Sequence, residues 1–147
     1  PWCDDNPHSG SYQVYWNSPN LAYSLYQNVS LSGYSSQIDA GNALINATGW
    51  FISNEYQAFP PFDVFWMQVR FYDGSSNELA EYRYDTGILN VSTWAQYGLT
   101  EYPVPAGTRS VQIRFNIYEY DGATYYDAGS ADDFSVKIGI KQPRATA

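Results

Sequence analysis

The chain has 147 residues, of which 44% are hydrophobic and 18% aromatic, whereas Lys, Arg, Asp and Glu together supply only 15%. The length suits one domain with a buried core, so we expect a single domain over 1–147 with an irregular head at 1–10 and a polar tail at 141–147. The formal net charge of −8 argues against a nucleic-acid partner, and no apolar run is long enough to insert into a membrane. A net negative charge is compatible with a neutral ligand, or with a ligand that binds through a bridging cation.

Apolar and polar residues alternate with a period of two through most of the chain, and no long segment shows the helical period. Eight β-strands are predicted, at 12–16, 25–31, 43–52, 62–72, 78–84, 95–102, 109–120 and 133–140. The turn-forming residues 73–77, Asp-Gly-Ser-Ser-Asn, are typical of a hairpin between two of them. The pattern predicts an all-β, two-sheet antiparallel β-sandwich of the jelly-roll kind.

Three N-glycosylation acceptor tripeptides begin at Asn28, Asn46 and Asn90, and none has proline in the middle position. They favour a secreted glycoprotein. Asn46 shares strand parity with Leu44 and Trp50, so we expect it to face inward and to be the weakest of the three acceptors.

Cys3 is the only cysteine, so an internal disulfide is excluded. Two interpretations remain open for it. The thiol is either buried or free, or it forms an intermolecular disulfide with another chain in an oxidising compartment.

In each of the segments 65–72 and 111–118, the odd-numbered residues are apolar and the even-numbered residues are polar or aromatic, so a strand there would have one apolar face and one polar-aromatic face. The residues of the apolar faces are predicted to be buried in the core, namely Phe65, Met67, Val69, Phe71, Val111, Ile113, Phe115 and Ile117. The opposite faces combine aromatic rings with amides and guanidinium groups, which suit a polyhydroxylated ligand. The predicted ligand-binding residues are Trp66, Gln68, Arg70, Tyr72, Arg114, Asn116 and Tyr118. A solvated face, or one covered by a loop, is the alternative.

An acidic segment at 126–134 precedes the last strand. If Phe134 and Val136 point inward, Asp132 shares their parity and enters the rim of the sandwich. Its carboxylate then needs partners, which are either loop amides or a structural calcium ion that takes further oxygens from Asp127 and Asp133.

Enzymatic activity is not expected. The sole histidine, His8, lies in the irregular head, which disfavours a nucleophilic triad, and no glycine-rich phosphate loop is present. A glycosidase needs only two carboxylates, but no pair in the sequence stands out.

Five segments of the chain resemble, in the same order, segments of a known superfamily: 25–31, 38–43, Trp50, 104–112 and 131–136. Over roughly 21–140 the chain resembles the galactose-binding-like β-sandwich, which includes jelly-roll carbohydrate-binding modules and discoidin-like domains. The resemblance implies the sandwich fold, and it places Asp132 and Asp133 where many such modules ligate structural calcium. It assigns no sugar-contacting residue, because ligand sites vary within the superfamily.

Two functions follow as hypotheses. The first is a secreted, lectin-like carbohydrate-binding module in which Trp66, Tyr72 and Tyr118 stack on sugar rings. The alternative is a glycosylated structural subunit of an extracellular fibre, coat or matrix, in which the same aromatic faces contact other copies or a matrix protein.

Overall fold

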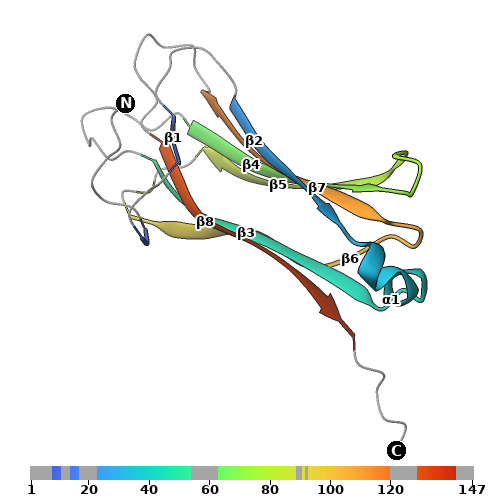
Figure 1. Cartoon of the computed structure of the whole chain (residues 1–147). Coiled ribbons are helices and arrows are strands. Elements are labelled where there is room, and N and C mark those ends of the chain that lie inside the picture. The colour runs from blue at the N-terminus through green and yellow to red at the C-terminus, as the bar shows by residue number, and fades with distance from the viewer. Residues whose placement is uncertain are drawn as a thin grey trace, which may run out of the picture.

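Two four-stranded antiparallel sheets face each other in the computed structural model, with strand orders β1-β8-β3-β6 and β2-β7-β4-β5 (Figure 1). The structure describes residues 8–10, 14–16, 23–53, 63–88, 91, 93–119 and 129–141. The strands are β1 Val14–Trp16, β2 Tyr23–Ser30, β3 Ala43–Ser53, β4 Asp63–Tyr72, β5 Glu78–Ile88, β6 Ala95–Pro103, β7 Ser110–Glu119 and β8 Gly129–Ile140. The predicted all-β antiparallel sandwich is confirmed.

The core lies between the inner faces of the two sheets and confirms the parity argument for the two central strands β4 and β7. Seven of the eight predicted inward residues are buried, namely Phe65, Met67, Val69, Phe71, Val111, Ile113 and Phe115, and the side chain of Ile117 is outside the described part. Phe51 of β3 meets Phe65 across the core, with ring centroids 4.8 Å apart. Burial of an aromatic or aliphatic side chain of this kind stabilises the fold by about 1.5–3 kcal/mol.

The hairpin predicted at residues 73–77 joins β4 to β5, which pair antiparallel. The Asp73 carboxylate closes the turn by accepting bonds from the backbone N–H groups of Ser75 and Asn77, at 2.8 and 2.9 Å. Ser76 adopts a positive φ of 67°. Because the Asp73 side chain accepts hydrogen bonds from the backbone of its own turn, residues 73–77 form a turn that the local sequence alone could predict.

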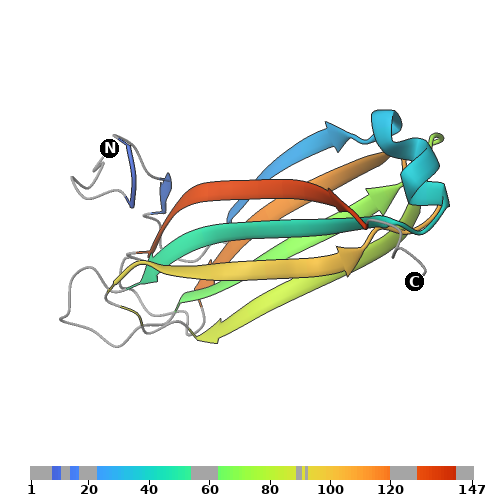
Figure 2. The same ribbon diagram turned by 90° about the horizontal axis from the view of Figure 1, so that it is seen from below.

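Two strands are markedly longer than predicted. Strand β8 begins at Gly129 instead of 133, and β5 continues to Ile88 instead of ending at 84. Gly129 and Ser130 have little intrinsic strand preference, and they are ordered by pairing with β1 and β3. A 3-10 turn, η1 at Ser32–Tyr34, and helix α1 at Ser35–Asp39 follow β2 and bury Ile38 at one end of the sandwich (Figure 2).

A β-bulge in β8 corrects the expected orientation of Asp132. Thr48 pairs with Ser135 but Trp50 pairs with Asp132, so Asp133 and Phe134 together oppose Gly49, and Asp133 has a φ of 49°. The extra residue reverses the parity, because Phe134 and Ala131 both pack on the core while Asp132 lies opposite the outward Trp50. The prediction that Asp132 shares the face of Phe134 is therefore wrong.

Asp39 of α1 ties the helical end of the sandwich to the segment before β7. Its carboxylate accepts bonds from two guanidinium nitrogens of Arg109, at 2.7 and 3.0 Å, and from the Gly107 N–H at 2.9 Å. These hydrogen bonds, chiefly those from Arg109, hold the pKa of Asp39 below its ordinary value. Among the described residues, no helix has the length and apolar character needed to cross a membrane.

Candidate functional site

The outer face of the β2-β7-β4-β5 sheet displays polar and aromatic side chains in rows that run across all four strands. Cross-strand pairing places Tyr26, Arg114, Gln68 and Arg83 in one row. The neighbouring rows are Ser24-Asn116-Trp66-Asp85, Asn28-Gln112-Arg70-Glu81 and Ser30-Ser110-Tyr72-Glu78. Directly opposite side chains lie about 4.5–5.5 Å apart at Cβ, so one ligand can contact several rows. We call this surface the outer face.

Arg114 and Tyr26 lie directly opposite each other on the strands β7 and β2 of the outer face. The Tyr26 side chain is 57% exposed, and the Arg114 guanidinium lies over its ring, 5.3 Å from the centroid. Arg114 Nε donates to Gln112 Oε1 at 2.6 Å, which fixes the guanidinium in place. Within the described part of the chain, Arg114 forms no ion pair with a carboxylate. Its terminal N–H groups are therefore available to a ligand.

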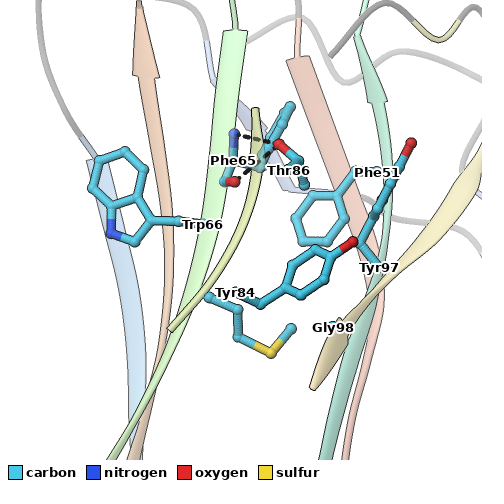
Figure 3. A pocket seen from close by; sticks show the side chains of 8 residues that line it. Phe51, Phe65, Trp66, Tyr84, Thr86, Tyr97 and Gly98 are labelled. Carbon is cyan, nitrogen blue, oxygen red and sulfur yellow. Dashed lines mark hydrogen bonds between the residues drawn. The ribbon is translucent and has the colours of Figure 1, made fainter. Parts of the chain in front are cut away.

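Trp66 of β4 lies in the row next to that of Arg114, beneath a second arginine. The Arg83 guanidinium is 4.8 Å from the indole centroid, and Arg83 also forms an ion pair with Asp85 at 2.8 Å. Figure 3 shows the indole on the opposite side of β4 from Phe51, Tyr84 and Tyr97, which point into the sandwich. The recess between those inner side chains leaves no room for a water molecule. The only open side of the indole among the described residues is therefore the outer face, where Trp66 was predicted to bind a ligand.

Two carboxylates of β5 hold Arg70 in place. Its terminal nitrogen is 2.9 Å from Glu78, and its Nε approaches Glu81 at 3.2 Å but off the line of a hydrogen bond. Glu81 also accepts a bond from Gln68 Nε2 at 3.1 Å. Arg70 and Gln68 are thus already engaged, and a ligand must share these groups with Glu81.

Asn116 differs from the other predicted ligand-binding residues because it is 6% exposed. Its amide nitrogen donates to Gln68 Oε1 at 3.3 Å and to the Trp66 carbonyl at 3.4 Å, and its oxygen accepts the Ser24 hydroxyl. Because both the oxygen and the nitrogen of this buried amide already form hydrogen bonds, Asn116 holds Gln68 in place and does not itself face a ligand. Tyr72 lies half-buried in the end row, while Tyr118 pairs with Val64 and its side chain is outside the described part.

Two residues of the outer face were missed by sequence reasoning, Tyr26 and Arg83. Both lie on edge strands of this sheet, β2 and β5, whereas the prediction used only the two central strands. The signal for Tyr26 was present as alternation within β2, but its position beside Arg114 depends on a register that the local sequence does not encode.

The bulge of β8 holds Asp132 and Asp133 against the head of the chain, on the outer side of the other sheet. Asp133 accepts bonds from the Ser9 hydroxyl and from His8 Nδ1, both at 2.7 Å, and these lower its pKa. Asp132 accepts the N–H groups of Ser9 at 3.1 Å and Asp133 at 2.8 Å. The His8 ring stacks on Trp50 at 3.9 Å.

These contacts bear on the predicted calcium site. All four carboxylate oxygens of Asp132 and Asp133 already accept a hydrogen bond, and the described residues contain no group of three or more His, Cys, Asp or Glu able to hold a metal ion. The described residues thus do not fit calcium by themselves, and Asp127 lies outside them. Calcium stays a prediction, and a melting midpoint that does not change in excess chelator would contradict it.

The predicted acceptor asparagines occupy different settings. Asn28 is exposed on the edge strand β2, whereas Asn46 lies on the central strand β3, where its oxygen accepts the Glu101 N–H at 2.9 Å. Asn46 is on the outer side of its sheet, between buried Ile45 and Ala47, so the expectation that it faces inward is wrong. Asn90 and Cys3 are outside the described residues.

No family model and no curated protein sequence matches this chain. Its fold is shared with the carbohydrate-binding module TmCBM61, solved with β-1,4-galactotriose, at a TM-score of 0.60 and 18% identity over 88% of this chain and 72% of that one. It is also shared with the enzymatically active domain of tailspike protein 4 of bacteriophage CBA120 (TM-score 0.56, 20% identity, 93% and 16% covered). A third similar structure is the VP2 protein of infectious bursal disease virus (TM-score 0.60, 11% identity, 88% and 29% covered).

These likenesses establish the class of the protein as an all-β sandwich domain, the fold that the resemblance to galactose-binding-like sandwiches implied. At such low identity the likeness extends to fold alone. The chain spans most of the module but less than a third of the tailspike and viral chains.

Proposed function

We propose that the domain is a secreted, non-enzymatic carbohydrate-binding module whose outer face holds a neutral glycan. The observation that carries the proposal is the row of Tyr26, Arg114 and Gln68, with Trp66 in the neighbouring row. The likeness in fold to a module that binds β-1,4-galactotriose supports it.

Each group of the outer face has a distinct part in this binding. The exposed ring of Tyr26 packs on the apolar C–H face of a sugar ring, and the free N–H groups of Arg114 donate to hydroxyls. Gln112 fixes Arg114, and Asn116 fixes Gln68. The net charge of −8 disfavours a polyanionic glycan through long-range repulsion, so a neutral sugar chain is the expected ligand.

Affinity electrophoresis in gels that contain β-1,4-galactan, followed by a neutral-glycan array, tests the proposal. We expect Arg114→Ala to weaken binding by about 10- to 150-fold, because a hydrogen bond to a charged group contributes about 1.5–3 kcal/mol. Tyr26→Ala and Trp66→Ala also weaken binding. Lys137→Ala on β8 and Tyr34→Ala on η1 are the matched controls, since both residues are exposed and lie away from the outer face. Unchanged retention of Arg114→Ala and Tyr26→Ala would contradict the site.

A subunit of an extracellular assembly is the second candidate function. Exposed apolar side chains on β2 and β8 favour it, notably Leu25, Val136 and Ile140 at 44%, 37% and 37% exposure. The two functions differ in the size of the purified protein. A monomer that reductant does not alter contradicts covalent assembly through Cys3, and a polymer contradicts a free binding module.

A further inference from the structure

Three of the sheet edges in the described part of the chain carry features that discourage pairing with another strand. Strand β5 has four charged residues, including Arg83 and Asp85, and irregular register against β4. Strand β6 has Pro103 and a positive φ of 57° at Glu101. Strand β8, beyond its short pairing with β1, has the bulge at Asp133 and the charge of Lys137. Charges, proline and bulges are the usual means by which proteins prevent edge-to-edge association.

Strand β2 has none of these features. Its eight residues, Tyr-Ser-Leu-Tyr-Gln-Asn-Val-Ser, contain no charge and no proline, and all eight pair with β7 in an unbroken register. An uncharged, regular strand at a sheet edge offers its free backbone groups to any extended chain. The polar backbone edge of β2 is therefore a potential pairing site on this molecule.

The apolar surface next to β2 adds to this tendency. A groove of about 300 Å³ opens between β2 and β8, lined by Val29 and Gln27 on one side and by Phe134, Val136 and Ile138 on the other. A strand that paired with β2 would cover this groove and gain burial as well as hydrogen bonds.

Asn28, the acceptor of a glycosylation tripeptide, lies in the second half of β2. Both Asn28 and Ser30 are exposed. Asn28 Oδ1 accepts a bond from Gln112 Nε2 at 2.9 Å, while its Nδ2, the atom to which a glycan is attached, donates no hydrogen bond to any of the described residues. The exposed Asn28 thus lies on the longest described edge strand that lacks charge, proline and bulges, since the equally uncharged edge strand β1 has only three residues.

We propose that Asn28 carries an N-linked glycan and that this glycan shields the β2 edge from pairing with another chain. A bulky hydrated oligosaccharide in the second half of an eight-residue strand blocks the approach of a partner backbone along most of the edge. Asn28 and Tyr26 are two residues apart on the same face of β2, about 7 Å along the strand, so the glycan must extend over the β2 edge and away from Tyr26 for the row of Tyr26 and Arg114 to bind a ligand. Trp66 lies two strands and four residues away from Asn28, about 10 Å across the sheet and 13 Å along it, and remains accessible.

Secretion of the full chain from an N-glycosylating host, with intact mass and glycopeptide mass spectrometry, tests the attachment. Light scattering behind size exclusion tests the shielding, on the wild type and on Asn28→Gln, Ser30→Ala and Asn28→Asp. We expect a monomeric wild type glycosylated at Asn28. We expect about a twofold rise in mass for Asn28→Gln and for Ser30→Ala, as strand pairing between two copies gives. Asn28→Asp lacks the glycan but places a charge on the edge, so it stays monomeric.

Three results would overturn the proposal: wild type unmodified at Asn28 in that host, glycosylated wild type that associates, or Asn28→Gln that remains monomeric at the same concentration. Association of Asn28→Asp to the same degree as Asn28→Gln would also overturn it, because a charge on the edge would then have no effect. Far-UV circular dichroism and melting curves of each variant separate association of folded protein from unfolding.

Discussion

The Arg83 guanidinium covers the indole ring of Trp66, 4.8 Å from its centroid, although the two residues are in neighbouring rows of the outer face. Asp85, directly opposite Trp66, holds this arginine by an ion pair at 2.8 Å. A sugar that stacks on Trp66 must therefore share the ring with a cation or displace it.

Arg83→Ala is expected to strengthen glycan binding. A cation–π contact over an exposed aromatic ring contributes about 0.5–1 kcal/mol, and a sugar that stacks on Trp66 in the wild type must give up this contact. Without Arg83 that cost disappears, so affinity should rise about two- to fivefold. Isothermal calorimetry with a β-1,4-galactan oligosaccharide measures the change. Trp66→Ala is the companion variant and loses affinity, while the double variant should resemble Trp66→Ala. A loss of affinity in Arg83→Ala would show instead that the arginine contacts the sugar.

The sequence was sufficient to predict the core faces of β4 and β7. Both are central strands that keep unbroken alternation through residues such as Met67 and Ile113, so parity and burial agree. In β8 the same argument gave the wrong face for Asp132, because a bulge at Asp133 inserts one residue and reverses the parity. The bulge depends on pairing with β3, which local sequence does not reveal.

The outer face was predicted by residue type, but the state of each group required the structure. Arg70 and Arg114 look equivalent in the sequence, yet Arg70 lies between Glu78 and Glu81 whereas Arg114 lies beside Gln112 and Tyr26. These partners come from strands up to 88 residues away, since Tyr26 pairs with Arg114. Register between distant strands is set by the packing of the whole sheet.

Asn116→Ala is expected to lower the free energy of unfolding by about 0.5–1.5 kcal/mol, because it removes the hydrogen bonds that the buried amide forms with the Ser24 hydroxyl and with Gln68 Oε1. Urea denaturation at neutral pH measures the loss. Ser24→Ala is the matched variant, which removes the donor and keeps the buried amide in contact with Gln68 and Trp66. An effect of Asn116→Ala on glycan affinity alone, with no change in stability, would assign Asn116 to the ligand instead of the scaffold.

Gly98→Ala is expected to destabilise the domain by about 3 kcal/mol or more. Gly98 has a φ of 153°, and an added Cβ would overlap the Ala47 carbonyl and the Thr48 Cα, which are backbone atoms that cannot rotate away. Gly139→Ala is the control, because a Cβ there meets nothing within 4 Å, so its stability should change by no more than about 0.5 kcal/mol. Equal melting midpoints for the two variants would contradict the close approach of β6 to β3.

Asp39→Asn tests the link between α1 and the segment before β7. The pKa of Asp39 in the folded protein lies below its ordinary value of 3.8, chiefly because of the hydrogen bonds from Arg109. A depressed pKa contributes stability that is present above the pKa of the unfolded chain and is lost as pH falls through the lower folded pKa. Asp39→Asn should therefore melt at a lower temperature than wild type at pH 7, and the difference should shrink as the pH is lowered below about 4. Melting curves of both proteins from pH 7 to pH 2.5 measure this, and a difference that is constant or grows in acid would show that Asp39 does not act through its charge.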